Sequence, residues 1–430
     1  MLLLKQNQKV CYRKRLFVIL ILILISSEAN FILAFPLVRY SLPHERVLLG
    51  NEIFLEDFPS ILKNKRLGLV INHTSSLPDG TPLVRALLDK GITIKAIFSP
   101  EHGFSGKEEA GSNIKDTQLE NIKIYSLFGK TKKPTPYQMQ EIDALVYDIQ
   151  DIGTRFYTYI TTLKYILEAA SESQKPVYVL DRPNLLGGEV IEGPILKPQF
   201  ESFIGACPIP VRYGLTVGEL ALMMKGEGWV PEDVDLRVIP LRNWKRTYFW
   251  EETGLPWIQT SPNIPTPQTA ILYPGIGLLG GIILNQGLGT SNPFLQFGAP
   301  WLKPEAIIQD LHGGKDYGLY LESLTYIPRS LPGKSLHPAY ENKICHGIRI
   351  HITQEQKVLS IRFTLALLNA IKKFHPEHLR PVSRPLNLMF GNDSLTQFLK
   401  GKNSYENLLA EMEKDENLFR ENRQKYLLYD

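Results

Sequence analysis

Short apolar runs alternate with helical patterns along the first half of the chain. Five of these runs are rich in Val, Ile and Leu without strict alternation, as expected of strands covered on both faces. They occupy residues 67–71, 92–98, 144–149, 177–180 and 236–240. Helical patterns separate them at residues 83–90, 137–141, 156–173 and 217–225. Strands separated by helices predict right-handed crossovers and an α/β fold with a Rossmann-like, doubly wound parallel sheet.

The pattern changes after Trp244. Proline-rich turns at 261–267 lead into a glycine-rich segment at 275–289. Mixed strands follow, including residues 347–352, then a long helix at 358–374 and C-terminal helices that end at Tyr429. This order predicts a second, smaller α+β domain. We therefore expect a catalytic domain at 45–245 and a C-terminal domain at 246–430 that closes a cleft.

The N-terminus has the features of an export signal. An apolar run at residues 16–25 follows five basic residues: Lys5, Lys9, Arg13, Lys14 and Arg15. This run is shorter than a membrane span, which is typical of a signal peptide. We predict a signal peptide at residues 1–34, with an uncleaved inner-membrane signal anchor as the alternative. The prediction is an exported protein, periplasmic or secreted, without a stable membrane span in its mature form.

The charge balance and the cysteines bear on two questions: whether the chain binds nucleic acid and whether it forms a disulfide. The formal net charge is +4, and without residues 1–34 the basic and acidic residues are equal in number. The mature chain therefore lacks the basic footprint of a nucleic-acid-binding protein, and we expect no nucleic-acid partner. Cys207 and Cys345 lie far apart in sequence, and two separately buried thiols are favoured over a disulfide.

Polar side chains follow four consecutive predicted strands. In open parallel sheets, ligands bind beyond the carboxyl ends of the strands, so these residues form a candidate site. They are Asn72, Glu101, His102, Asp148, Asp151, Arg155, Asp181, Arg182 and Asn184. The alternative for the aspartates and arginines is a structural role in helix caps or ion pairs.

Cofactor and metal sites are not supported. The turn at 72–82 has neither of the glycine-rich motifs that cradle phosphates, so no nucleotide cofactor is expected. His375 and His378 are separated by Pro376, which breaks the helix needed to place both rings on one face. A solvated turn is favoured there over a ligand pair, and no metal is expected.

Several longer motifs point to a known family. They include SPEHGFSG (99–106), YDIQDIGTRFYTY (147–159), DRPNLLGG (181–188), IPVRYGLTVGEL (209–220), PFLQFGAPW (293–301) and KYLLY (425–429). In these motifs and in their order, the chain resembles the NamZ-type exo-β-N-acetylmuramidases of peptidoglycan turnover. The resemblance implies a glycoside hydrolase that releases N-acetylmuramic acid from non-reducing ends of peptidoglycan fragments. It also implies a site in the cleft between a Rossmann-like domain and a smaller C-terminal domain.

The resemblance assigns the catalytic role to Glu101. Glycoside cleavage needs an acid and a base or nucleophile, and Asp148, Asp151 or Asp181 could supply the second carboxylate. Assistance by the acetamido group of the substrate would need none of them as a nucleophile. For the lactyl carboxylate of the substrate, Arg155 and Arg182 offer bidentate donors. Residues expected to bind sugar are Asn72, His102, Phe104, Arg155, Tyr157, Asp181, Arg182 and Asn184, although the two aromatic rings suit a core position equally well.

Two positions depart from the family pattern. Gly280 stands where the pattern has an acidic residue, and Leu288 stands where it has an arginine. Loss of an acid and a cation from the cleft favours an alternative function. The alternative is a weakened or inactive cell-wall sugar-binding protein.

Overall fold

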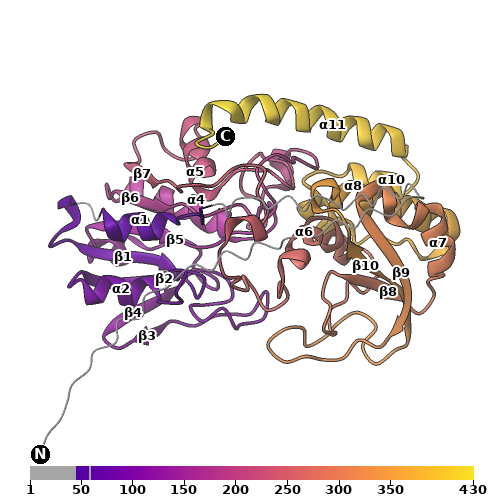
Figure 1. Ribbon diagram of the computed structural model, residues 1–430, viewed down its shortest axis with the longest axis horizontal. Coiled ribbons are helices and arrows are strands. Elements are labelled where there is room, and N and C mark those ends of the chain that lie inside the picture. The colour runs from indigo at the N-terminus through magenta and orange to yellow at the C-terminus, as the bar shows by residue number, and fades with distance from the viewer. Residues whose placement is uncertain (1–44, 58–59) are drawn as a thin grey trace, which may run out of the picture. The chain divides into compact units, whose positions relative to one another are not determined.

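A seven-stranded sheet organises the N-terminal half of the chain (Figure 1). The computed structural model describes residues 45–57 and 60–430, and the predicted leader at 1–34 lies outside them. The strands run in the order β3-β4-β2-β1-β5-β6-β7. Their bounds are β1 Arg66–Ile71, β2 Thr93–Ser99, β3 Thr117–Leu119, β4 Ile122–Ser126, β5 Ala144–Asp148, β6 Val177–Leu180 and β7 Leu236–Ile239.

The expected Rossmann-like fold is confirmed. All neighbouring strands except β3 and β4 pair in parallel, and the chain reverses its direction of growth between β1 and β5. The sequence prediction missed β3 and β4. Both are short, and β3 at the sheet edge is largely exposed, so neither presents the apolar run of a covered strand. The site therefore lies beyond the carboxyl ends of β1, β2 and β5, next to the switch point.

Helices cover both faces of this sheet. Successive residues of β1 point to opposite sides, with Leu67 and Leu69 in one buried cluster and Val70 in the other. One face packs against α1 (Gly50–Glu56) and α2 (Leu83–Asp89). The other face packs against three helices: α3 Pro136–Gln140, α4 Tyr159–Glu172 and α5 Val217–Gly226. Burial on both sides explains why these strands show no alternation of polar and apolar residues.

The C-terminal half is a smaller α+β arrangement, as expected. Its sheet is antiparallel, in the order β8-β10-β9. The strands are β8 Gln296–Ala299, β9 Leu319–Tyr326 and β10 Cys345–Ile352. The helices are α6 Pro267–Ile276, α7 Pro304–Asp310, α8 Ser360–Phe374, α9 Ser383–Phe390, α10 Ser394–Leu399 and α11 Tyr405–Asn422. Helices α6 and α8 approach closely at Gly275, where a Cβ atom would lie 1.9 Å from the Ser360 carbonyl oxygen.

The chain then returns to the α/β half through α11, drawn in yellow in Figure 1. Glu416 on α11 accepts a hydrogen bond from the Gly193 backbone N–H (2.9 Å). Past the helix, the Tyr429 hydroxyl donates to the Asp181 carboxylate (2.5 Å). Both halves therefore contribute to one buried core.

The structure also bears on the expectations for the two cysteines, for membrane-spanning helices and for the turn at His375 and His378. Cys207 and Cys345 are both free and buried, which confirms two separate thiols. Within the described ranges, no helix is long and apolar enough to cross a membrane. The turn predicted at His375–His378 is not fully solvated, because the His375 ring is buried and its Nε2 accepts a hydrogen bond from the Lys303 backbone N–H (3.2 Å).

Candidate active site

The loop after β2 is bent sharply by residues with left-handed backbone. His102, Gly103 and Gly106 have φ values of 68°, 73° and 68°. At Gly106 a Cβ atom would lie 1.9 Å from Nδ1 of His73, so only glycine fits against that ring. The His73 ring is itself fixed, because its Nε2 lies 2.6 Å from the Gln259 carbonyl oxygen. This packing holds the start of the loop, and Glu101 with it, at the end of β2.

The Glu101 carboxyl group is held by two separate elements. One oxygen, Oε1, accepts a hydrogen bond from the Gly111 backbone N–H (2.9 Å). The other, Oε2, accepts from the Thr158 hydroxyl (2.6 Å). Thr158 is the N-cap residue of α4, but its side chain does not cap the helix and is free to contact Glu101. The loop and the helix together fix the direction in which the carboxyl group points.

Glu101 lines a cavity of about 280 Å³ to which both halves of the chain contribute. From the α/β half come His102, Tyr157 and Thr158, and from the C-terminal half Tyr273 and Leu288. This volume is at the small end of the range for ligand pockets, and it suits one sugar residue better than a chain of them.

Aromatic rings form one wall of this cavity. The ring centroids of Phe156 and Tyr273 are 5.2 Å apart, and those of Tyr273 and Phe294 are 4.8 Å apart at an interplanar angle of 82°. The Tyr157 ring packs edge-on against Tyr273 at 6.1 Å. Burial raises the pKa of both tyrosines, so their phenols stay protonated. The result is a rigid, uncharged surface of the kind that packs against a sugar ring.

Asp148 and Arg182 form an ion pair in the interior. Arg182 Nε lies 2.5 Å from the Asp148 carboxylate, and the two side chains are 3% and 0% exposed. Asn51 also donates to Asp148 (3.1 Å). Neither residue lines the Glu101 cavity. The contacts favour the structural interpretation of this pair over a catalytic aspartate and a substrate-binding arginine.

The other two aspartates are also occupied inside the fold. Asp151 accepts hydrogen bonds from the Gly153 backbone N–H (2.6 Å) and from the Tyr213 hydroxyl. Asp181 accepts from the Thr216 hydroxyl (2.7 Å) and from Tyr429. Burial raises the pKa of each carboxyl group to about 7. Because neither lines the cavity, the structure does not support either as the second catalytic carboxylate.

Arg155 joins backbone segments instead of facing a ligand. Its guanidinium donates to the carbonyl oxygens of Pro194 (2.8 Å), Ile209 and Met389 (3.0 Å). The side chain is fully buried. Its role in the described contacts is therefore to tie the segment before α4 to the C-terminal half, and it does not line the cavity where a lactyl carboxylate would bind.

Three remaining predicted residues lie near the site but outside the cavity. The Asn72 side-chain oxygen accepts hydrogen bonds from the backbone N–H and the hydroxyl of Thr74. Asn184 donates to the Leu215 carbonyl oxygen (2.8 Å). Phe104 packs partly buried against the second core cluster. Of the predicted site residues, the structure thus brings Glu101, His102 and Tyr157 together in one cavity.

Comparison with known proteins identifies the family. Residues 67–268 match the N-terminal domain, and residues 271–429 the C-terminal domain, of the family described as exo-beta-N-acetylmuramidase NamZ. The chain belongs to the NamZ family. The peptidoglycan beta-N-acetylmuramidase NamZ of Bacillus subtilis is 37% identical over 391 residues, which are 89% of this chain and 92% of that protein.

Solved structures agree with the fold described above. Two crystal structures of DUF1343 family proteins from Bacteroides fragilis share its fold, with TM-scores of 0.82 and 0.73. They are 33% and 32% identical to this chain and cover 90% of it and 99% of their own length. The two NamZ domain matches meet near residue 270, whereas the sequence pattern places the boundary near 245. The segment between these positions hydrogen-bonds to the α/β half, for example through the Tyr159 hydroxyl and the Thr260 carbonyl oxygen (3.0 Å).

Several residues around Glu101 were missed by the sequence analysis. They are Gly111, Thr158, Ser261, Asn263, Tyr273 and Phe294. Thr158 and Phe294 stand inside the motifs at 147–159 and 293–301, but nothing in the sequence specifies that a threonine hydroxyl donates a hydrogen bond to Glu101. Of the two departures from the NamZ pattern, Leu288 lines the cavity and Gly280 is exposed outside it.

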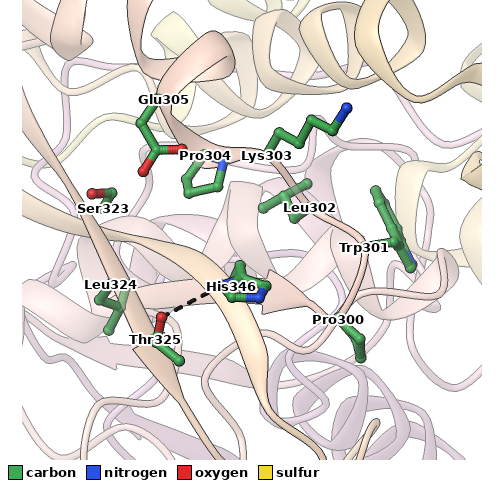
Figure 2. Close-up of a pocket in the computed structure, with 10 residues that line it drawn as sticks. All are labelled: Pro300, Trp301, Leu302, Lys303, Pro304, Glu305, Ser323, Leu324, Thr325 and His346. Carbon is green, nitrogen blue, oxygen red and sulfur yellow. Dashed lines mark hydrogen bonds between the residues drawn. The ribbon is translucent and has the colours of Figure 1, made fainter.

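A larger cavity of about 610 Å³ lies wholly in the C-terminal NamZ domain (Figure 2). Its lining includes Trp301, Lys303, Glu305 and His346, and the Thr325 hydroxyl lies 3.5 Å from His346 Nδ1. No residue of the motif at 99–106, which contains Glu101, lines this larger cavity. Among the residues that the structure describes, no group of His, Cys, Asp and Glu is placed to hold a metal ion. The Glu101 cavity is therefore the candidate active site.

Proposed function

We propose that this protein is an exo-acting glycoside hydrolase that releases N-acetylmuramic acid from the non-reducing ends of peptidoglycan fragments. The observation that carries the proposal is the Glu101 carboxyl group, held in a cavity of single-sugar size by Gly111 and Thr158. Family membership supplies the reaction class and the wall-derived substrate.

The contacts of Glu101 suit an acid that must give up and regain a proton. The Gly111 N–H can only donate, so Oε1 stays an acceptor in both protonation states. The Thr158 hydroxyl can donate or accept, so Oε2 can carry a proton without losing its partner. Protonation of the glycosidic oxygen by Oε2 would then assist departure of the leaving sugar.

Exo action is supported by the dimensions of the cavity. A volume of about 280 Å³, with aromatic rings on one side, accommodates a terminal sugar but leaves little room for sugars on both sides. An endo-acting enzyme instead needs an open groove that follows the polysaccharide.

We further propose that the protein works outside the cytoplasm, in the periplasm or after secretion. The support is the basic segment followed by the apolar run at residues 16–25, together with a substrate that lies outside the cytoplasmic membrane.

The deciding experiment compares the native protein with Glu101→Gln on a chromogenic N-acetyl-β-muramoside and on the disaccharide with N-acetylglucosamine. The native protein should release N-acetylmuramic acid. The variant should lose about 10²–10⁴-fold in kcat, because it cannot donate a proton to the leaving oxygen. Glutamine keeps the shape and both hydrogen-bond contacts, so the melting temperature should hardly change.

Two results would contradict this proposal. A loss of less than about tenfold in the variant would remove Glu101 from the reaction. Tight binding of muramic sugars by a native protein that never turns them over would support the alternative, a cell-wall sugar-binding protein.

A further inference from the structure

The cavity contains one carboxylate but the reaction needs two proton transfers. One proton goes to the leaving oxygen and another is lost by the attacking water. Within the described chain, the cavity lining supplies Glu101, the imidazole of His102, and the phenols of Tyr157 and Tyr273 as ionisable groups. The phenols stay protonated because burial raises their pKa, which leaves the His102 imidazole as the second group in the lining that can accept a proton.

The tautomer of His102 is set by the loop that carries it. Its Nδ1 lies 2.7 Å from the Glu108 carbonyl oxygen, which can only accept. In the neutral ring, the hydrogen therefore sits on Nδ1 and Nε2 bears the lone pair. Nε2 has no protein partner among the described residues and is not sealed away from solvent. This is the arrangement that a general base requires.

The groups around His102 leave it free for this role. His73 lies close by, but burial lowers its pKa, so it stays neutral and adds no competing charge. The backbone carbonyl of Glu108 contacts the His102 ring, whereas the Glu108 side chain is exposed. Glu101 is the charged group that shares the cavity with His102.

We propose that His102 is the catalytic base of this enzyme. This inference rests on the proposed function. Nε2 of His102 takes a proton from a water molecule as that oxygen forms a bond to C1 of the muramic residue. The C1–O bond to the leaving sugar breaks, its electron pair stays on the leaving oxygen, and the Glu101 carboxyl group supplies the proton there. Transfer from the imidazolium through water to Glu101 then restores both groups. A single displacement of this kind inverts C1, so the first product is the α-anomer.

The matched variant is His102→Asn. Asparagine tolerates the left-handed backbone at this position, and its amide nitrogen can replace Nδ1 as donor to Glu108. It lacks only the counterpart of Nε2. His346→Asn, which changes an exposed imidazole in the other cavity, is the control and should leave the rate unchanged.

The experiment measures kcat and KM for the full-length protein on a 4-nitrophenyl N-acetyl-β-muramoside. His102→Asn should lower kcat by about 10²–10⁴-fold with KM within about threefold, and should remove the acidic limb of the pH profile. Sodium azide should restore turnover and yield a glycosyl azide, because azide attacks without giving up a proton.

Three outcomes would overturn the role of His102 in an active enzyme. They are a folded His102→Asn variant within tenfold of the native rate, no rescue by azide, or an unchanged acidic limb. If the variant fails to fold, the native protein still decides, because the β-anomer as the first product excludes the single displacement proposed for this base. Complete inactivity of the native protein would instead count against the proposed function itself.

Discussion

At the scale of single residues, the composition of the Glu101 cavity determines which sugars it can hold. Its lining in the described chain contains no lysine or arginine, although a muramic substrate carries a lactyl carboxylate. Leu288 is partly exposed at this wall, where the family pattern has an arginine. Gly280 is not part of the cavity lining. Its backbone is not left-handed, and a Cβ atom there would meet the Gln286 amide at 2.4 Å. The relevant departure is therefore Leu288.

We expect Leu288→Arg to lower KM for muramosides relative to N-acetylglucosaminides by roughly tenfold. A charge-assisted hydrogen bond to the lactyl carboxylate would supply the corresponding ~1.4 kcal/mol. Leu288→Met is the matched control, because it keeps an apolar side chain of similar volume. The ratio of the two KM values, measured for each variant, checks this prediction. An equal change on both sugars would show that the lactyl group is bound elsewhere.

At the scale of the elements, the sequence predicts the sheet better than the site. Covered strands are visible as apolar runs, and a parallel sheet directs ligands to the carboxyl ends, so the position of Glu101 after β2 follows from the pattern. The pattern does not say which polar side chains turn inward. Asp148 ends β5 and Glu101 follows β2, yet Asp148 pairs with Arg182 in the core whereas Glu101 lines the cavity. That difference depends on tertiary packing between distant segments, which periodicity does not encode.

The Asp148–Arg182 pair gives a prediction at this scale. Arg182→Ala should destabilise the protein by about 3–5 kcal/mol, because it leaves the buried carboxylate of Asp148 without its counter-charge. Equilibrium unfolding in urea measures this loss. The double variant Asp148→Leu/Arg182→Met removes both charges, so its free energy of unfolding should fall much less than that of Arg182→Ala. If Arg182→Ala instead kept full stability and lost discrimination between muramic and N-acetylglucosamine substrates, Arg182 would be a substrate ligand after all.

At the scale of the whole molecule, the last residues of the chain stabilise the first domain. The Arg423 side chain donates to the carbonyl oxygen of Gly214 (2.7 Å), and the Leu428 backbone N–H donates to Glu219 (2.8 Å). The motif at 425–429 could be noticed in the sequence only through its resemblance to a family, because nothing local shows that a C-terminal tyrosine reaches Asp181. The two halves that form the cavity are thus held by contacts more than 200 residues apart in sequence.

Stability of the whole fold should depend on pH through Asp151. Its carboxyl group is buried, one oxygen lacks a partner, and burial raises its pKa from 3.8 to about 7. The folded protein therefore binds this proton more tightly than the unfolded chain does. The stabilisation is present below about pH 4 and is lost as pH rises towards 7, by at most about 1.4 kcal/mol per pH unit. We expect the free energy of unfolding of the native protein, relative to Asp151→Asn, to fall over this range, because asparagine cannot ionise. Urea unfolding at several pH values between about 4.5 and 7.5 measures the difference.

Asp143→Asn is the control for this prediction. The Arg66 guanidinium lowers the pKa of Asp143 to about 2, so the contribution of Asp143 to stability is lost only as pH falls below about 4 and should be constant across the measured range. A constant difference between the native protein and Asp151→Asn would mean that Asp151 is ionised inside the fold throughout.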